Sequence, residues 1–431
     1  MLAGPHPRSR GGTAFAARRS RRRFSLFPFP FSLGTIRAPV LPLRDILVVS
    51  VEQAVAAPFA TRQLADLGAR VIKIERPDGG DFARSYDTTV KGLSSYFVWL
   101  NRSKESLTLD LKRPAARDVL ARLVDRADVF VQNLAPGAAN RLGTTAATLR
   151  ARHPRLIVCH VSGYGSSGPY AAKKAYDLLV QSEVGLLSIT GTEAAPSKVG
   201  ISVADIAAGM YAYSGILSAL LARARTGTGT SIEVSLFDAL AEWMGFAAYY
   251  TDYGGTPPRR SGANHASIAP YGPFESRGHD QIYLGIQNVR EWTRFCADVL
   301  RRPELANDER FRTNPLRVEH RVPLHEAIAS VFDRLSTSEI IERLELAEIA
   351  WSRLNSVDDL LKHPQLLARD CWKEVDSPVG LIRALRPAVW MDDVEPVMGP
   401  VPTLGQHSES ILRELGFDAA TISAWRRDGT I

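Results

Sequence analysis

Short apolar runs alternate with helix-like stretches through the first half of this chain. Residues 45–51 form a continuous apolar run, which is typical of a parallel strand covered on both faces. A helix that opens near Pro58 and closes at Gly68 follows, and residues 71–75 form the next predicted strand. These elements make one βαβ unit. The pattern then predicts three further strands, at residues 107–111, 128–132 and 156–161.

This alternation predicts an α/β fold built on a doubly wound parallel sheet. Helices are expected around residues 176–188 and 206–224, with a strand at 231–235. Near residue 250 the character changes, because a breaker-rich run at 254–258 precedes two strands that pair around Arg277. The expected organisation is a basic tail at 1–43, a large domain at 44–250, a smaller α+β domain at 251–355, and a segment at 356–431 that returns to the large domain.

The basic charge of the chain is concentrated at its start. Nine arginines and no acidic residue precede Asp45, and without them the formal net charge falls from +7 to −2. The charge therefore does not indicate a nucleic-acid-binding face. The apolar run at 24–31 is short and broken by proline, so it predicts no membrane span. Two interpretations stay open for residues 1–43: a mitochondrial transit peptide, or upstream sequence included by a wrong start.

Cysteine usage and motifs exclude several classes of protein. Three widely spaced cysteines form neither a disulfide framework nor a metal cluster, so we expect a reducing compartment, the cytoplasm or alternatively the mitochondrial matrix, and no metal. The loop after the first strand lacks GxGxxG, which disfavours NAD. HExxH, GxSxG and CxxC are also absent, so metal-dependent hydrolysis and serine or cysteine nucleophiles have no support.

One acidic residue, Asp205, lies at the predicted start of a long helix of small apolar residues. There, free backbone N–H groups and the helix dipole favour the ionised form. A lone ionised carboxylate is a candidate nucleophile. The alternative is that Asp205 only caps the helix, since aspartate is a preferred N-cap. For Asp177, which opens the helix before it, a capping role is the favoured interpretation.

Basic residues cluster at the predicted carboxyl ends of the strands and in the adjoining loops. Open α/β sheets bind ligands at this edge, and a ligand with several phosphates would suit such a set. The residues are Lys73, Arg76, Arg102, Lys104, Lys112 and Arg141.

Six segments in order make this chain resemble the class III CoA-transferases, the family of formyl-CoA transferase and carnitine-CoA transferase. The resemblance covers about residues 45–420. The segments are AAPFATRQLADLGARVIKIERPDGGDFAR at 56–84, LNRSKESLTLDLK at 100–112, ADVFVQNLAPGAANRLG at 127–143, VSGYGSSGPY at 161–170, VADIAAGMYAYSGILSALLARARTGTG at 203–229 and LGQHSESILRELG at 404–416.

The resemblance implies a Rossmann-like large domain and a smaller domain in an interlocked, ring-like homodimer. It implies that Asp205 is the catalytic nucleophile, forming aspartyl-anhydride and aspartyl-CoA intermediates. An acyl-CoA donor and a carboxylate acceptor are the implied substrates; coenzyme A thioester is a cosubstrate and no cofactor is tightly bound. Contacts to coenzyme A are implied for Val55, Ala56, Arg76, Leu109, Lys112, Asn133, Arg141 and Lys174.

Residues 262–271 resemble the branch that acts on short dicarboxylates, such as the succinyl-CoA–glutarate transferases. His265 is the candidate for binding the distal carboxylate, although a lone loop histidine is more often structural. Tyr176 is a second candidate for substrate binding. Some family members close four consecutive glycines over the site, whereas this chain has only Gly254 and Gly255.

Two other functions stay open. An α-methylacyl-CoA racemase shares the implied fold and aspartate, but two-base racemisation needs a second proton carrier. Those racemases resemble GHD where this chain has Ala175, Tyr176 and Asp177, and tyrosine is a poor substitute for histidine near neutral pH. The other alternative is a non-catalytic CoA-binding protein.

Overall fold

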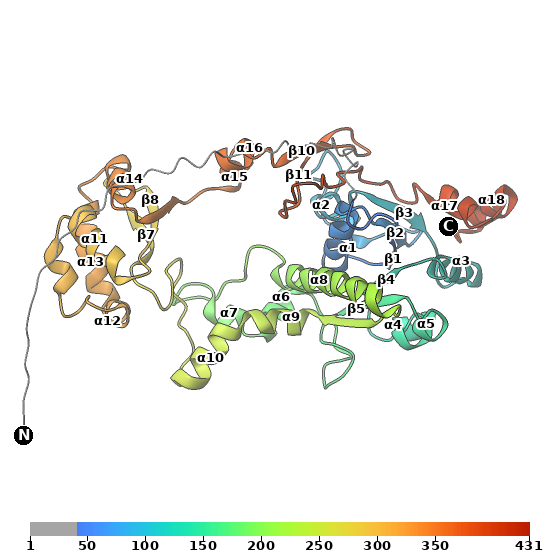
Figure 1. Cartoon of the computed structure of the whole chain (residues 1–431), viewed down its shortest axis with the longest axis horizontal. Helices are drawn as coiled ribbons and strands as arrows, with labels where there is room; N and C mark the ends of the chain where they lie inside the picture. Colours follow the sequence, from blue (N-terminus) through green and yellow to red (C-terminus); the bar gives the residue numbers. More distant parts are fainter. Residues whose placement is uncertain (1–40) are drawn as a thin grey trace, which may run out of the picture. The chain divides into compact units, whose positions relative to one another are not determined.

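A six-stranded, all-parallel sheet organises the first half of the computed structural model, which describes residues 41–431 (Figure 1). The order across the sheet is β3-β2-β1-β4-β5-β6. The winding reverses between β1 and β4, so the predicted doubly wound α/β fold is confirmed. The strands are β1 Leu47–Val51, β2 Arg70–Glu75, β3 Lys104–Thr108, β4 Val129–Gln132, β5 Ile157–Ser162 and β6 Ser231–Ser235.

Helices cover both faces of this sheet. Neighbouring residues of each strand point to opposite sides, so apolar side chains on both faces need covering. Val48 packs with α1 and α8 in one core, whereas Val49 packs with α3 in a second core. The helices of this part are α1 Ala56–Asp66, α2 Ser95–Asn101, α3 Pro114–Val124, α4 Ala138–Leu142, α5 Ala146–Arg152, α6 Asp177–Glu183, α7 Leu186–Ile189, α8 Val203–Thr226, α9 Leu236–Trp243 and α10 Gly245–Gly254, with a 3₁₀ turn at Phe82–Ser85.

Helix α8 is long and apolar enough to meet a length-and-composition criterion for a membrane span. It nevertheless packs against α1, α6, α9 and the strands β5 and β6. Buried small residues such as Ala208 and Ala212 let these neighbours approach closely. These contacts are those of a core helix.

Strand β3 differs from the prediction. The apolar pattern predicted residues 107–111, whereas the strand spans Lys104–Thr108 and pairs with β2 along its length. The pattern is misleading because Lys104 and Ser106 are polar yet buried in the strand. Their partners, described below, replace the apolar contacts that a buried strand ordinarily makes.

An antiparallel sheet, β7-β8-β9, follows in residues 271–353 and packs with helices around its own core. The predicted pairing of strands around Arg277 is confirmed. The elements are β7 Tyr271–Glu275, β8 Gln281–Gly285, α11 Val289–Arg294, a π-helical turn at Phe295–Val299, a 3₁₀ turn at Pro303–Asn307, α12 Asn314–Glu319, α13 Arg321–Phe332, α14 Thr337–Leu346 and β9 Ala350–Arg353.

The last part of the chain contacts the parallel sheet along its β3 edge. The hydroxyl of Ser408 accepts a hydrogen bond from the backbone N–H of Thr108 at 3.0 Å, and the N–H of His407 donates to the Ser106 carbonyl. The C-terminal residues thus cover an otherwise open edge strand. The elements here are α15 Val357–Leu361, α16 Pro364–Ala368, the hairpin β10 Trp372–Val375 with β11 Ile382–Leu385, α17 Ser408–Glu414 and α18 Ala419–Asp428.

The basic tail expected at residues 1–43 lies outside the described residues, apart from its last three positions. Of these, Leu43 is buried and its backbone N–H donates to the carbonyl of Leu67.

Candidate active site

The loop between β1 and α1 contains an unusual backbone conformation. Ala54 has a φ of 63°, in the left-handed region that alanine seldom adopts. Its backbone N–H donates to Asp81 Oδ1 at 3.0 Å. The same oxygen accepts from the N–H of Ala83 at 2.9 Å. A single carboxylate oxygen therefore joins the β1–α1 loop to the 3₁₀ turn after β2.

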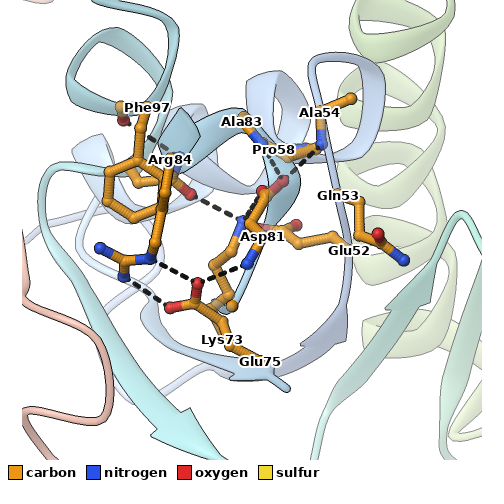
Figure 2. A network of polar contacts seen from close by, with 12 residues as sticks. Glu52, Gln53, Ala54, Pro58, Lys73, Glu75, Asp81, Ala83, Arg84 and Phe97 are labelled. Atoms are coloured by element: carbon orange, nitrogen blue, oxygen red, sulfur yellow. Dashed lines mark hydrogen bonds and ion pairs between the residues drawn. The ribbon is translucent and has the colours of Figure 1, made fainter. Parts of the chain in front are cut away.

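Asp81 belongs to a network of buried charges that we call the Asp81 network (Figure 2). Lys73 Nζ on β2 lies 2.6 Å from Asp81 Oδ2, and Lys104 Nζ on β3 lies 2.7 Å from Glu52 Oε1. The side chains of Glu52, Lys73, Lys104 and Asp81 are all 0% exposed. Such groups are stable inside a protein only when paired, because desolvation of a lone charge is costly.

Glu75 and Arg84 extend the network toward the C-terminal segment. Both Arg84 nitrogens that donate to Glu75 lie 2.7 Å from its oxygens, and the guanidinium lies over the ring of Phe97 (Figure 2). Burial opposes ionisation of Glu75, but the Arg84 hydrogen bonds and the charge of Lys73 outweigh it and lower its pKa to about 2. Burial also opposes the charge on Lys73, yet Asp81, Glu52 and Glu75 together raise its pKa.

This arrangement corrects one sequence prediction. Lys73, Arg102 and Lys104 were counted in a set of basic residues that would suit a ligand with several phosphates. All three are buried and paired with carboxylates, Arg102 with Asp66 at 2.9 Å. Their carboxylate partners were not predicted from the sequence. A lysine inside an apolar run, such as Lys73 in residues 71–75, could have indicated them, since a buried cation requires a counter-charge.

A second tie joins β1 to β4 at the point where the winding reverses. The backbone N–H of Gln53 donates to Asn133 Oδ1 at 2.8 Å, and Asn133 Nδ2 donates back to the Gln53 carbonyl at 2.7 Å. Asn133 was predicted to contact coenzyme A. In this structure its side-chain amide is bonded on both sides to the β1–α1 loop.

The N-terminus of α1 presents free backbone donors. Val55 and Ala56 are buried, and no side chain caps this helix. Within the described residues, the backbone N–H groups of Val55, Ala56 and Ala57 donate to no acceptor. Buried, unpaired N–H groups at a helix N-terminus favour a negatively charged oxygen.

Helix α8 meets this N-terminus through Gly209. A Cβ atom at Gly209 would lie only 2.7 Å from the Ala56 carbonyl oxygen and 3.0 Å from the Phe59 ring, so the approach requires glycine. Asp205 precedes Gly209 by four residues, and residues so spaced share one face of a helix. The Asp205 carboxylate therefore lies on the α8 face that meets the N-terminus of α1.

Asp205 is in the first turn of α8, as predicted, but it does not cap the helix. The cap comes from α6, where Asp177 Oδ1 accepts from the N–H of Ala204 at 2.8 Å. Gln181 donates to the other Asp177 oxygen at 2.7 Å and accepts from the N–H of Val199 at 3.0 Å. Asp177 is thus a cap, although of α8 and not of its own helix.

The ionisation of Asp205 differs from the sequence expectation, which was that the helix dipole favours the charged form. Burial, and secondarily the like charge of Asp177, raise the pKa of Asp205 to about 7. Among residues 41–431, no hydrogen bond or ion pair reaches its side chain. The carboxylate is therefore held without a compensating cation.

Tyr86 is a neighbour that the sequence did not indicate. Its ring packs edge-on against Tyr96, with centroids 5.4 Å apart. Burial, and then the charges of Asp81 and Asp205, raise its pKa to about 12, so the phenol stays protonated as a hydrogen-bond donor. No sequence motif marks this position.

The remaining residues implied to contact coenzyme A are mostly exposed. Arg76 follows β2 and donates to the Gly80 carbonyl at 3.1 Å, while Leu109 follows β3 and is buried. Lys112 and Arg141 are exposed at the same edge of the sheet. Lys174 is exposed beside Lys173, which pairs with Glu183 at 2.7 Å.

The two candidate substrate-binding residues differ in how firmly they are held. Tyr176 is 65% exposed. His265 stacks on Tyr271 with centroids 5.1 Å apart, and its Nδ1 accepts from the N–H of Ser267. That hydrogen bond assigns the ring proton to Nε2, which can donate to a carboxylate.

In the part of the chain that the structure describes, histidine, cysteine and acidic side chains do not gather into a group of three that could hold a metal ion.

Comparison with known proteins shows that the chain matches one protein family. A family model described as CoA-transferase family III matches residues 43–408. An acyl-CoA transferase of Fusarium pseudograminearum is 35% identical over 406 residues, which cover 90% of this chain and 88% of that protein. Succinyl-CoA:glutarate CoA-transferase of Mus musculus is 33% identical and covers 90% of both chains.

A solved structure gives the same result for the fold. The crystal structure of a CAIB/BAIF family protein from Brucella suis superposes with a TM-score of 0.75 at 32% identity. The match covers 87% of this chain and 99% of that one.

Proposed function

Because this chain belongs to CoA-transferase family III, we propose that it moves coenzyme A from succinyl-CoA to a short dicarboxylic acid through intermediates covalently bound to Asp205. Transferase activity on CoA thioesters comes with the family, and the thioester is a cosubstrate. The donor, the acceptor and the covalent chemistry are the proposal. The observation that carries it is the position of Asp205, a carboxylate without a cation partner among residues 41–431 on the α8 face whose Gly209 meets the first turn of α1.

The proposed cycle begins at the donor thioester. An Asp205 carboxylate oxygen attacks the thioester carbonyl, the carbon–sulfur bond breaks, and CoA leaves as the thiolate. The thiolate then attacks the aspartyl carbonyl of the mixed anhydride, which releases the donor carboxylate and leaves an aspartyl-CoA thioester. These covalent steps preserve the energy of acyl activation, which hydrolysis would lose.

The acceptor completes the cycle by the reverse order of steps. Its carboxylate attacks the aspartyl thioester, the carbon–sulfur bond breaks, and a second mixed anhydride forms with release of CoA thiolate. The thiolate attacks the acceptor carbonyl of this anhydride, giving the new acyl-CoA and restoring Asp205. Each attack places negative charge on a carbonyl oxygen, which the free N–H groups of Val55 and Ala56 are placed to stabilise.

The raised pKa of Asp205 suits this role. A carboxylate whose pKa lies near 7 is a stronger nucleophile than an ordinary one and still ionises at neutral pH. Its unpaired state also leaves the oxygens free to approach the substrate. Tyr86, whose phenol stays protonated, is a candidate donor beside it.

Coenzyme A contacts are proposed at the carboxyl edge of the sheet. Arg76, Lys112, Arg141 and Lys174 supply cations for phosphates that lie far from the sulfur. Leu109 and the α1 N-terminus supply surfaces that the ligand can approach. Binding at this distance can position the thioester for attack.

For the acceptor, the comparisons favour a dicarboxylate. Relatives from Mus musculus and Agrobacterium fabrum are a succinyl-CoA:glutarate and a succinate–glutarate CoA-transferase, the second 32% identical. We propose that His265 binds the distal carboxylate through its Nε2 proton, and that Tyr176 contacts the substrate. Homodimer formation is also proposed, with support from exposed apolar side chains on α9 and α10 such as Trp243, Phe246 and Tyr253.

The test is a CoA-exchange assay on the full chain. Succinyl-CoA is mixed with a panel of mono- and dicarboxylic acids, and new acyl-CoA is measured by mass spectrometry with Asp205→Ala alongside. Transfer to a dicarboxylate by the parent but not by the variant is the expected result. Transfer only from other donors would contradict succinyl-CoA, and α-proton exchange of a branched acyl-CoA without transfer would indicate a racemase.

A further inference from the structure

We propose that Asp81 is a positioning residue, which holds the β1–α1 loop so that the amides of Val55 and Ala56 face the carbonyl that reacts at Asp205. This inference rests on the proposed function. The Asp81 side chain is buried behind the loop, so it acts through Ala54 and not on the substrate.

The loop does not hold its conformation by itself. The left-handed backbone of Ala54 brings its Cβ close to the following carbonyl oxygen, a cost that glycine escapes. The hydrogen bond from Ala54 N–H to Asp81 Oδ1 offsets this cost. The free N–H groups belong to the three residues that follow, Val55, Ala56 and Ala57, so the conformation of Ala54 sets where these donors point.

Asp81 is itself fixed by the strands beneath it. Its second oxygen lies 2.6 Å from Lys73 Nζ, and Lys73 Nζ also donates a hydrogen bond to Asn101 Oδ1 at 3.0 Å. The backbone N–H of Asp81 donates to Glu75 Oε2 at 3.0 Å. Lys73 and Glu75 both belong to β2, so Asp81 connects the β1–α1 loop to the sheet (Figure 2).

The requirement for a charged residue follows from the balance of the Asp81 network. Three acidic side chains, Glu52, Glu75 and Asp81, face three basic ones, Lys73, Lys104 and Arg84. Removing the Asp81 charge leaves one buried cation in excess, and the network must rearrange. The amides need accurate placement, because donors stabilise a developing oxyanion only at hydrogen-bond distance.

A merely structural role must be distinguished, because any buried ion pair contributes to stability. Asp128 is the matched control. It pairs with a cation, Arg223 at 2.9 Å, and accepts one backbone N–H, from Leu47 at 2.9 Å, where Asp81 accepts two; its side chain is 27% exposed and lies at the amino edge of the same sheet. Asp128→Ala therefore removes the same kinds of interaction far from the β1–α1 loop.

The experiment compares Asp81→Ala, Asp128→Ala, Ala54→Gly and the double variant Asp81→Ala/Ala54→Gly in the full chain. We measure kcat and KM for transfer from the donor that the parent uses, the Kd of free coenzyme A and the thermal midpoint. We expect Asp81→Ala to lower kcat by about 10- to 100-fold while the Kd of coenzyme A changes by less than about twofold. Asp128→Ala lowers the thermal midpoint and leaves kcat within about twofold.

Glycine at position 54 should then relieve the defect. Ala54→Gly alone is the reference for the double variant, because glycine adopts the same conformation without strain. In the double variant it restores kcat by at least about threefold over Asp81→Ala. If kcat is not restored in the double variant, Asp81 does not act through Ala54. If kcat is unchanged in Asp81→Ala, the Asp81 network contributes only to stability and the inference is wrong.

A second variant covers the case in which Asp81→Ala does not fold. Ala54→Val leaves every charge in place but disfavours the left-handed conformation, since a β-branched residue resists it. It should lower kcat with little change in the Kd of coenzyme A, and an unchanged kcat would overturn the inference. A parent chain without transfer activity would refute the proposed function instead.

Discussion

Two carboxylates near the carboxyl edge of the parallel sheet have opposite surroundings. Asp81 is fully buried, contacts Lys73 and accepts two backbone N–H groups. Asp205 lies in the first turn of α8, and the charged group that affects it most is another carboxylate, Asp177. The Asp81 network is a fixed ionic scaffold, whereas Asp205 is a single acid that titrates near neutral pH.

The comparison separates burial from reactivity. Burial raises the pKa of an acid, and a cation or donated hydrogen bonds lower it again, as at Glu75. At Asp205 nothing in the described chain opposes burial, so the carboxylate keeps both its raised pKa and its free oxygens. The charges of the Asp81 network and the charge of the proposed nucleophile therefore belong to different residues on different elements.

The largest effect is expected from replacing Asp205, the proposed nucleophile. We expect Asp205→Asn to lower the rate of CoA transfer by at least about 10³-fold, since an amide cannot form the anhydride. The measurement is the exchange assay at saturating donor and acceptor. An Asp205→Asn variant with more than a few per cent of parent activity would place the nucleophile elsewhere.

The same variant also tests the raised pKa through stability. Because the folded pKa lies above the ordinary 3.8, ionisation of Asp205 costs folding free energy that is absent below pH 3.8, grows as the pH rises, and is complete above about 7. Asp205→Asn removes this cost. Its thermal midpoint should exceed that of the parent more at pH 8 than at pH 5, and an equal difference at both would contradict the shift.

The next largest effect is expected from a substitution that moves α8 away from the first turn of α1. Gly209→Ala places a methyl group 2.7 Å from the Ala56 carbonyl, a backbone atom that cannot turn aside. We expect a loss of about 1–3 kcal/mol in unfolding free energy and a drop in kcat of about tenfold or more. Gly215→Ala on the same helix is the control, because its methyl meets only the Ile232 side chain. Equal kcat values in the two variants would argue against close approach as a requirement.

The third prediction concerns Arg76, an exposed cation close in sequence to the buried Lys73. Lys73 belongs to the Asp81 network, whereas Arg76, three residues later, is exposed. Arg76→Ala should raise the KM for acyl-CoA by about tenfold with kcat changed by less than about threefold, because it removes one phosphate contact. Arg117→Ala, an exposed change on α3, should leave the KM unaltered. A fall in kcat alone would remove Arg76 from the proposed binding edge.

The smallest effect concerns the pair of carboxylates. The rate in the parent should rise with pH through about 7 as Asp205 ionises. Asp177→Asn keeps an acceptor for the Ala204 N–H but removes the neighbouring charge, so the pKa of Asp205 falls and the pH profile moves to lower pH. The rate at pH 8 should stay within about threefold of the parent. A profile that does not move would show that burial alone sets the pKa.

The sequence predicted the elements better than the interactions among them. Apolar runs located β1, β2, β4 and β5, because strands covered on both faces must be apolar, and β6 was placed after a Gly-rich turn. β3 was displaced since Lys104 and Ser106 are buried polar residues. The Asp81 network joins Glu52, which follows β1, to residues on or after β2 and on β3, so its pairs appear only once the order of strands is known.

The same limit applies at Asp205. Its place in the first turn of a long helix follows from local sequence, and a candidate nucleophile could be named there. Its pKa could not be given the right direction, because Asp177 comes from another helix, α6, through a loop that the sequence does not define. Likewise, the free amides of α1 depend on Ala54, whose conformation is held by a residue 27 positions away.

The contact between Thr108 and Ser408 spans 300 residues of chain, and it has a consequence for synthesis. At about 5–20 residues per second, a ribosome needs roughly 15–60 seconds to make the segment between them. During that interval the β3 strand has emerged and its outer edge has no cover. Unpaired edges join other chains readily, so we expect the nascent chain to be most prone to association with other chains before Ser408 has been made.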